Sequence, residues 1–297
     1  MKKKRDLIIT AIFGILFLLG LSVMLYPTFA NWWNQRHQTR AIAQYKEAVA
    51  NMDDSETQKL LDEANDYNAK LAKLHAPFTN FGSIPGYEDI LNISGTGIMG
   101  YVSIPNINVE LPIYHGTSDG VLQIASGHIQ GSSLPVGGAD THAVISGHRG
   151  LPSAKLFTDL DQLVVGDTFT INVLNEVMMY EVEEILVILP DNVEELSIIP
   201  GKDYVTLMTC TPYGVNSHRL LIRAHRINSL LDKQVKVSGD ALQVDSMTLI
   251  PIVFAILTAL LLIYWRITGR RRKNIHIDKY IIKKLPSERG PRHDNDK

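Results

Sequence analysis

The chain has 297 residues, of which 45% are hydrophobic and only 20% are charged. Soluble globular chains carry about 25% charged residues, so long apolar segments must dilute the charge here. The formal net charge of −2 argues against a dedicated nucleic-acid binder, because such proteins are usually basic. The apolar content excludes a wholly disordered chain. A single cysteine, Cys210, excludes an intramolecular disulfide and a cysteine-based zinc site, and we expect no cofactor.

Two uncharged stretches, residues 7–26 and 247–265, are each about long enough to cross a bilayer as a helix. Basic residues flank both stretches on their outer sides, within residues 1–6 and 266–297, and basic flanks stay in the cytoplasm. We therefore expect a two-pass membrane protein with both termini cytoplasmic and the intervening region outside the cell. A cleaved signal peptide is the alternative for the first stretch. Its apolar part is longer than the 7–15 residues typical of such peptides, which favours an anchor.

Residues 27–75 show a helical pattern. A first helix carries Ala43, Tyr45 and Val49. Ser55 and Gln58 have the spacing of a capping box and predict the start of a second helix. Apolar residues then recur at spacings of three and four, as on one face of a helix: Leu60, Leu61, Ala64, Tyr67 and Leu71.

After Pro77 the sequence changes to short β-branched runs separated by glycine and proline. Phe169, Ile171 and Val173 alternate with polar residues, as in a half-buried strand. Many short strands of this kind predict a mainly β domain, a sandwich or a barrel, over residues 91–230. Residues 231–246 would link this domain to the second apolar stretch.

Cys210 is a candidate nucleophile because it ends a strand-like run and a turn follows at once, at Pro212 and Gly214. Arg219 opens the next strand-like run, so a hairpin would bring the two side chains close together. A guanidinium in that position can hold a developing oxyanion. A buried structural cysteine is the alternative that the spacing leaves open.

A thiol enzyme also needs an acid or a base. The β region offers six histidines: His115, His128, His142, His148, His218 and His225. His148 is the most favourably placed, in the segment 146–150 that directly follows the apolar run 143–145. Because a lone histidine is more often structural, its position does not by itself assign a role.

The run 206–219, which contains Cys210 and Arg219, resembles the cysteine-to-arginine signature of sortases, and the run 146–149 resembles their histidine segment. Residues 100–105, 111–117 and 133–138 are similar to segments of the class C, pilus-building branch. The resemblance implies a closed, eight-stranded sortase-type β-barrel with an N-terminal helical extension and two flanking transmembrane helices.

The resemblance also implies the chemistry. Cys210 would attack the carbonyl between Thr and Gly of a Leu-Pro-x-Thr-Gly-like sorting signal and form a thioacyl enzyme. His148 would be the general acid and base, and Arg219 would hold the oxyanion. The partners would be pilin subunits with C-terminal sorting signals, one of which supplies the lysine amine that accepts the acyl group.

Two other functions remain open from the sequence. A wall-anchoring sortase would use a peptidoglycan amine of a cell-wall precursor as the acceptor. An inert membrane-tethered binding protein would require Cys210, His148 and Arg219 to coincide by accident.

Residues 76–90 match the lid of class C sortases, which usually carries an Asp-Pro-aromatic motif over the active site. This chain has Ala76, Pro77 and Phe78 at that place. Phe78 can still cover the cysteine, whereas Ala76 cannot pair with Arg219. We therefore expect a loosely latched lid. The alternative is that the segment is a linker between the helices and the barrel.

Overall fold

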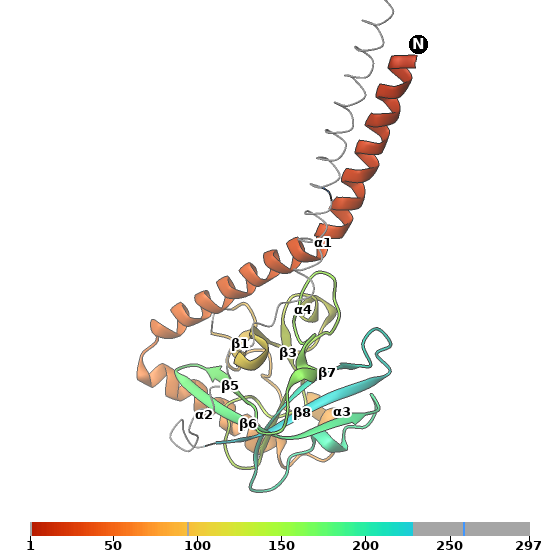
Figure 1. Ribbon diagram of the computed structural model, residues 1–297. Coiled ribbons are helices and arrows are strands. Elements are labelled where there is room, and N and C mark those ends of the chain that lie inside the picture. The colour runs from red at the N-terminus through yellow and green to blue at the C-terminus, as the bar shows by residue number, and fades with distance from the viewer. Residues whose placement is uncertain (1, 94, 228–257, 259–297) are drawn as a thin grey trace, which may run out of the picture. The chain divides into compact units, whose positions relative to one another are not determined.

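The computed structural model describes residues 2–93, 95–227 and 258 of the chain (Figure 1). The helices are α1 (Lys2–Ala50), α2 (Asp54–Leu71), α3 (Pro77–Asn80) and α4 (Asp119–Leu122), with short 3-10 helices η1 (Phe81–Ser83), η2 (Pro105–Ile107), η3 (Leu160–Gln162) and η4 (Glu194–Leu196). The strands are β1 (Ile98–Ile104), β2 (Val109–His115), β3 (Ser126–His128), β4 (Thr141–Ser146), β5 (Thr168–Val173), β6 (Glu176–Ile188), β7 (Asp203–Thr211) and β8 (His218–Arg226).

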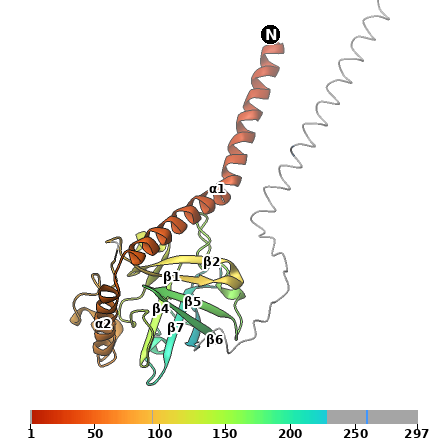
Figure 2. The same cartoon turned by 90° about the vertical axis from the view of Figure 1, so that its left-hand side faces the viewer.

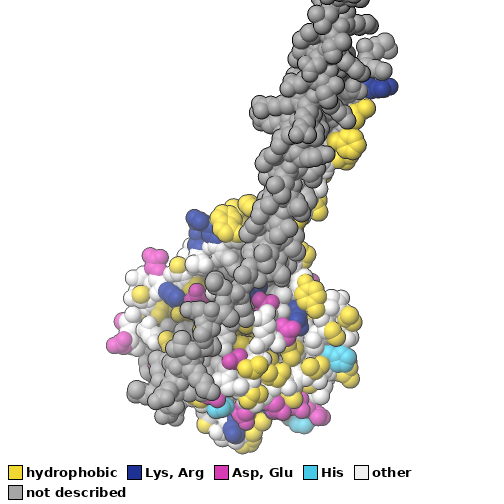
Figure 3. Space-filling view, in the orientation of Figure 1, with side chains coloured by type: hydrophobic (Ala, Val, Ile, Leu, Met, Phe, Trp, Pro, Cys, Tyr) yellow, Lys and Arg dark blue, Asp and Glu magenta, His cyan; other side chains and the backbone are white. Residues whose placement is uncertain are grey.

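Helix α1 continues without a break from the apolar N-terminal stretch into the region beside the barrel. Within the described residues it is the one helix long and apolar enough to cross a membrane, over Ile8–Ala50. From Ile8 to Trp33 most of its large apolar side chains are exposed (Figure 3). Residues 7–26 and the first part of 27–75 thus belong to one helix. Pro27 lies inside it, and Figure 1 shows α1 bent part-way along its length, because a proline kinks a helix without necessarily ending it.

Helix α2 begins two residues earlier than the predicted capping box, so that prediction is wrong. Asp53 is the N-cap, and its Oδ1 accepts a hydrogen bond from the Glu56 N–H at 2.7 Å. The Glu56 carboxylate accepts in return from the Asp53 N–H at 3.3 Å. Ser55 lies inside the helix, and the amide of Gln58 donates instead to Asp62 at 2.8 Å. The predicted apolar face is confirmed by the burial of Ala64, Tyr67 and Leu71.

Within the described residues, eight strands close into a barrel in the order β1-β2-β3-β4-β7-β8-β6-β5, which confirms the predicted closed eight-stranded barrel. The pairs β2–β3 and β4–β7 are parallel, and the other neighbouring pairs are antiparallel. In Figure 2 the strands wrap around one another with α1 and α2 on their outer side.

The barrel interior is a continuous apolar core, and α1 and α2 add Tyr45, Val49, Tyr67 and Leu71 to it. The predicted alternation in β5 is confirmed, since Phe169, Ile171 and Val173 are buried in this core. A second group of apolar side chains, here called the outer cluster, lies apart from it. The outer cluster consists of Val144, Ile188, Leu196 and Leu221, packed by Phe78, Ile129, Leu186 and Met208.

The predicted linker 231–246, the second apolar stretch 247–265 and the basic tail 266–297 lie outside the described residues, apart from Thr258.

Candidate active site

Cys210 and Arg219 lie directly opposite each other in the β7–β8 hairpin. The two strands are antiparallel, and their register pairs Cys210 with Arg219. The connecting loop is closed by hydrogen bonds from the N–H groups of Val215 and Asn216 to the carbonyl of Pro212, at 3.1 and 2.9 Å. The predicted hairpin is therefore confirmed, and it places the thiol and the guanidinium on neighbouring strands.

Both side chains project from the outer face of the barrel. Val205 and Leu207 of β7 point into the core, whereas Met208 contributes to the outer cluster. Because side chains alternate along a strand, Cys210 shares the face of Met208. The same alternation in β8 places Arg219 on the face of Leu221, a member of the outer cluster.

Arg219 keeps donor capacity for a ligand. Its Nη1 donates to the carbonyls of Asn216 and His218, at 3.3 and 3.1 Å. No carboxylate in the described part of the chain forms an ion pair with it. A guanidinium has five N–H donors, so the remaining ones can bind a carbonyl oxygen or an oxyanion beside Cys210. Cys210 itself is a free, half-buried thiol.

His148 lies two residues beyond the end of β4, close to the last residues of β7. The N–H of Gly147 donates to the Met208 carbonyl at 3.0 Å, and the Thr209 hydroxyl donates to the Gly147 carbonyl at 2.8 Å. These bonds hold Gly147 against Met208 and Thr209, the two residues that precede Cys210. Position 147 has no room for a side chain, because a Cβ there would lie 2.6 Å from the Phe157 ring. The structure thus brings all three predicted catalytic residues to one region of the barrel.

Other histidines of the β region are engaged in structural contacts. His128 bonds to the Tyr87 hydroxyl at 2.9 Å and to the Ser133 carbonyl at 2.7 Å, and burial lowers its pKa to about 4. His142 bonds to the Ser197 carbonyl and the Thr206 hydroxyl, and burial lowers its pKa to about 4 as well. Both rings are neutral in the folded protein near pH 7. Both rings are fully buried and both of their nitrogens are engaged in these hydrogen bonds, which favours a structural role.

Sequence reasoning missed a contact between the loops that follow His148 and Cys210. Arg149 forms an ion pair with Asp161, and its guanidinium lies 5.6 Å from the ring centre of Tyr213. The Tyr213 ring also covers Gly150, where a Cβ would lie 2.9 Å from it. Arg149 and Tyr213 both belong to the recognised motifs, but nothing in their spacing indicates that they touch.

Phe78 packs on the outer face of the barrel. It lies on α3 and joins the outer cluster with Met208, two residues before Cys210 on the same face of β7. Gly131 allows this approach, because a Cβ there would lie 2.9 Å from the Phe78 Cα and 3.0 Å from the carbonyl oxygen of Pro77. Ala76 is exposed, adopts a left-handed conformation with φ 51° and carries no side-chain cap for α3.

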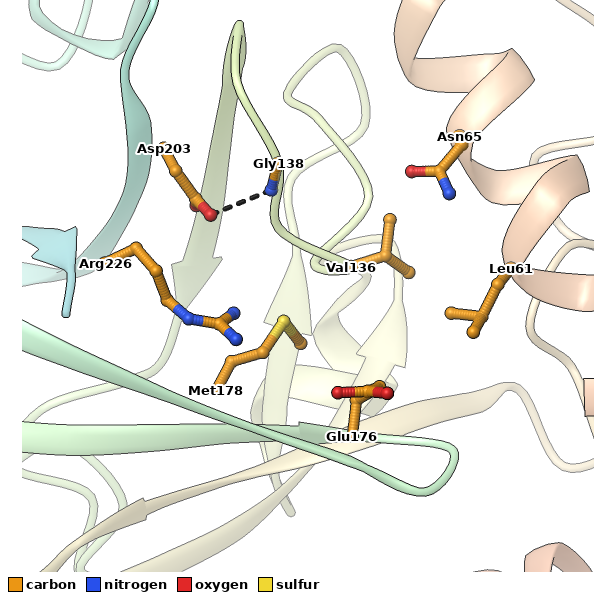
Figure 4. Close-up of a pocket in the computed structure, with 8 residues that line it drawn as sticks. All are labelled: Leu61, Asn65, Val136, Gly138, Glu176, Met178, Asp203 and Arg226. Atoms are coloured by element: carbon orange, nitrogen blue, oxygen red, sulfur yellow. Dashed lines mark hydrogen bonds between the residues drawn. The ribbon is translucent and has the colours of Figure 1, made fainter. Parts of the chain in front are cut away.

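A polar cleft of about 330 Å³ lies at the other end of the β7–β8 hairpin (Figure 4). Asp203, the first residue of β7, and Arg226, the last of β8, point into it together with Glu176. Cys210 lies seven positions after Asp203 along β7. The cleft is therefore not part of the candidate active site.

The family model that matches the chain is "Sortase domain", over residues 102–227. Among solved structures, sortase C1 from Streptococcus agalactiae matches with a TM-score of 0.59 and 49% identity, covering 64% of this chain and 99% of that one. Sortase C from Streptococcus pneumoniae matches with a TM-score of 0.58 and 42% identity, covering 64% and 97%. Sortase C from Clostridium perfringens, described with the C-terminal cell wall sorting motif, matches with a TM-score of 0.57 and 42% identity, covering 64% and 100%.

Curated relatives match at lower identity. Sortase A of Streptococcus agalactiae is 31% identical over 117 residues, which are 38% of this chain and 47% of that protein. Sortase SrtE1 of Streptomyces coelicolor is 27% identical over 71% of this chain and 55% of its own length. The chain thus spans about half the length of these two relatives. With 49% identity across nearly the whole length of a solved sortase C1, the chain belongs to the sortase family.

Proposed function

We propose that the chain is a membrane-anchored cysteine transpeptidase that assembles pili. It cleaves a Leu-Pro-x-Thr-Gly-like sorting signal between Thr and Gly and joins the Thr carbonyl to a lysine amine of another pilin subunit. The observation that carries the proposal is the cross-strand pairing of Cys210 with Arg219. The hydrogen bond from Gly147 to Met208 brings the segment that contains His148 beside this pair. The solved relatives add support, because sortase C of Streptococcus pneumoniae is described with pilin substrate specificity and another sortase C1 is that of a pilus island.

Each proposed role follows from the position of the side chain. The Cys210 sulfur attacks the Thr carbonyl, and the carbon–nitrogen bond to Gly breaks as the thioester forms. His148 gives a proton to the leaving Gly amine and later takes one from the incoming lysine amine. Arg219 donates hydrogen bonds to the oxyanion in both steps. The second step forms an isopeptide bond and frees the Cys210 sulfur, so the reaction is acyl transfer and not net hydrolysis.

The anchor and its orientation are part of the proposal. Helix α1 would cross the membrane, with the basic residues 2–5 on the cytoplasmic side and the barrel outside. A second crossing at 247–265 would return the chain and leave the basic tail 266–297 in the cytoplasm.

We also propose that residues 76–90 form a lid. Phe78 reaches the outer cluster beside Met208, which supports a covering role near Cys210. Because Ala76 offers no carboxylate to Arg219, closure would depend on the packing of Pro77 and Phe78.

The test is incubation of the full-length protein in detergent with a pilin subunit and, separately, with a cell-wall precursor amine. Mass spectrometry then locates the new bond. An isopeptide bond between the sorting-signal Thr and a pilin lysine supports the proposal. Transfer to the cell-wall amine alone would identify a wall-anchoring sortase, and the absence of both products would identify a binding protein.

A further inference from the structure

The residues that follow His148 form a loop whose base is closed by hydrogen bonds. In this loop, here called the His148 loop (residues 148–158), the Phe157 N–H donates to the His148 carbonyl at 3.1 Å. The Gly150 N–H donates to the Thr158 hydroxyl at 3.1 Å, and Phe157 is completely buried. The far end of the loop is therefore bonded directly to the backbone of His148.

The tip of the His148 loop is bound to the membrane helix. The side-chain oxygen of Asn31 accepts a hydrogen bond from the Lys155 N–H at 2.8 Å. The side-chain amide of Asn34 donates to the Ser153 carbonyl at 2.8 Å. Ala154, between the two bonded residues, is 2% exposed. The two asparagines are three residues apart and so lie on the same face of α1.

The contacts of that face of α1 are polar near Asn31 and Asn34 and apolar further along the helix. Further toward the C-terminus it packs on the barrel through apolar side chains, with Ile42, Tyr45 and Val49 buried. At Asn31 and Asn34 the contact consists of amide–backbone hydrogen bonds, and the side chains beside them on the helix are exposed, Trp32 and Trp33 among them. An apolar contact tolerates sliding, whereas a hydrogen bond fixes both distance and direction. The contact at this level is therefore suited to positioning.

We propose that Asn31 and Asn34 are positioning residues for His148, through which the membrane helix holds the acid–base group in register with Cys210. The inference rests on the proposed role of His148. Exposed Trp32 and Trp33 on the same turn are side chains that favour the membrane interface, so the anchor would also hold the His148 loop near the bilayer surface.

The test uses the fact that Asn31 accepts its hydrogen bond whereas Asn34 donates its own. Asn31→Asp keeps an oxygen that accepts from Lys155, so we expect its kcat to stay within about twofold of the wild type. Asn34→Asp loses the donor and places a carboxylate against the Ser153 carbonyl. We expect about a tenfold lower kcat with KM unchanged, because misplacing a catalytic group by about 1 Å can cost up to a hundredfold. Asn31→Leu, which removes the acceptor, should behave like Asn34→Asp.

The assay is cleavage of a fluorogenic sorting peptide by the full chain in detergent, measured well below the unfolding temperature of each variant. Gln35→Glu is the matched control, since Gln35 is exposed on the same helical turn. The inference is overturned if Asn34→Asp keeps its kcat, if only KM changes, or if Asn31→Asp and Asn34→Asp lose activity equally. His148→Ala is measured alongside. If that variant were active, the proposed role of His148 would fail, whatever the asparagine variants showed.

Discussion

Each end of the β7–β8 hairpin carries an arginine, Arg226 at the far end and Arg219 at the near end, and the two arginines have different surroundings. At the far end, the carboxylate of Asp203 accepts from the Gly138 N–H at 2.8 Å and from the Tyr180 hydroxyl at 2.9 Å. Arg226 lies over the Tyr180 ring at 5.7 Å. At the near end, Arg219 faces Cys210 and donates to loop carbonyls, with no carboxylate partner among the described residues. At the far end the Asp203 carboxylate accepts two hydrogen bonds and Arg226 packs on an aromatic ring, whereas the Arg219 guanidinium at the near end keeps donors that no described side chain engages.

Replacement of the nucleophile tests the near end most directly. Cys210→Ala should abolish polymer formation, because no other side chain can form the thioester, and should leave the fold intact. The measurement is the amount of pilin polymer by gel electrophoresis, with thermal unfolding as the control for folding. Retention of more than a few per cent of the transpeptidation would show that the catalytic assignment is wrong.

Loss of the acid–base group should come next in size. General acid–base groups contribute about 10²–10⁴-fold, so His148→Ala should lower kcat within that range. His128→Gln and His218→Ala are the controls and should change mainly stability or binding. Steady-state kinetics with a sorting peptide separate these cases. A loss of less than tenfold for His148→Ala would move the role to another residue.

The buried histidines predict how stability depends on pH. Burial lowers the pKa of His128 from 6.5 to about 4, and the Ser133 carbonyl opposes this in part. Between these two values the unfolded chain binds a proton that the folded chain does not. Stability should therefore fall as the pH drops from 6.5 to 4, by at most about 3 kcal/mol for this group.

Denaturant unfolding at pH 7 and pH 4.5 measures this effect. His128→Gln should be less stable at pH 7 but should lose less stability on acidification than the wild type. Identical losses in the two proteins would show that His128 does not govern the acid sensitivity.

A substitution at the far end should separate stability from activity. Asp203→Ala leaves the Gly138 N–H and the Tyr180 hydroxyl without their acceptor, which typically costs about 1–3 kcal/mol. The cysteine end of the hairpin is untouched, so kcat/KM should stay within twofold. Urea unfolding and peptide cleavage provide the two measurements. A large loss of activity at unchanged stability would mean that the cleft in Figure 4 takes part in the reaction.

How far the sequence predicts this molecule depends on whether a contact is local. The pairing of Cys210 with Arg219 was predictable, because two strand-like runs joined by a short turn determine the register of a hairpin. The start of α2 was not, since Asp53 with Glu56 and Ser55 with Gln58 both have capping-box spacing and only the backbone decides between them.

Contacts between distant segments left no signal in the sequence. Asn34 and Ser153, which are joined by a hydrogen bond, lie 119 positions apart in the sequence. An asparagine on an exposed helical turn looks the same whether it binds a loop or water. His148 was an intermediate case, because its strand was predictable from apolar residues while its proximity to Cys210 depended on the parallel pairing of β4 with β7.

The lid should give the smallest effect, and it tests whether the near end is open in the resting protein. Phe78 is half-buried in the outer cluster, so its contact is worth about 1 kcal/mol, or roughly fivefold in the opening equilibrium. Phe78→Ala should therefore speed the reaction of Cys210 with a thiol reagent about fivefold. Phe81→Ala is the matched control, because Phe81 is a half-buried aromatic of η1 outside the outer cluster.

Ala76→Asp should act in the opposite direction. A carboxylate facing Arg219 adds about 0–1 kcal/mol to closure if the pair is exposed. Aspartate also tolerates the left-handed conformation of position 76 better than alanine does. Both effects should slow the labelling of Cys210. If the labelling rate responds to neither Phe78→Ala nor Ala76→Asp, residues 76–78 are a linker and the near end is open in the resting protein.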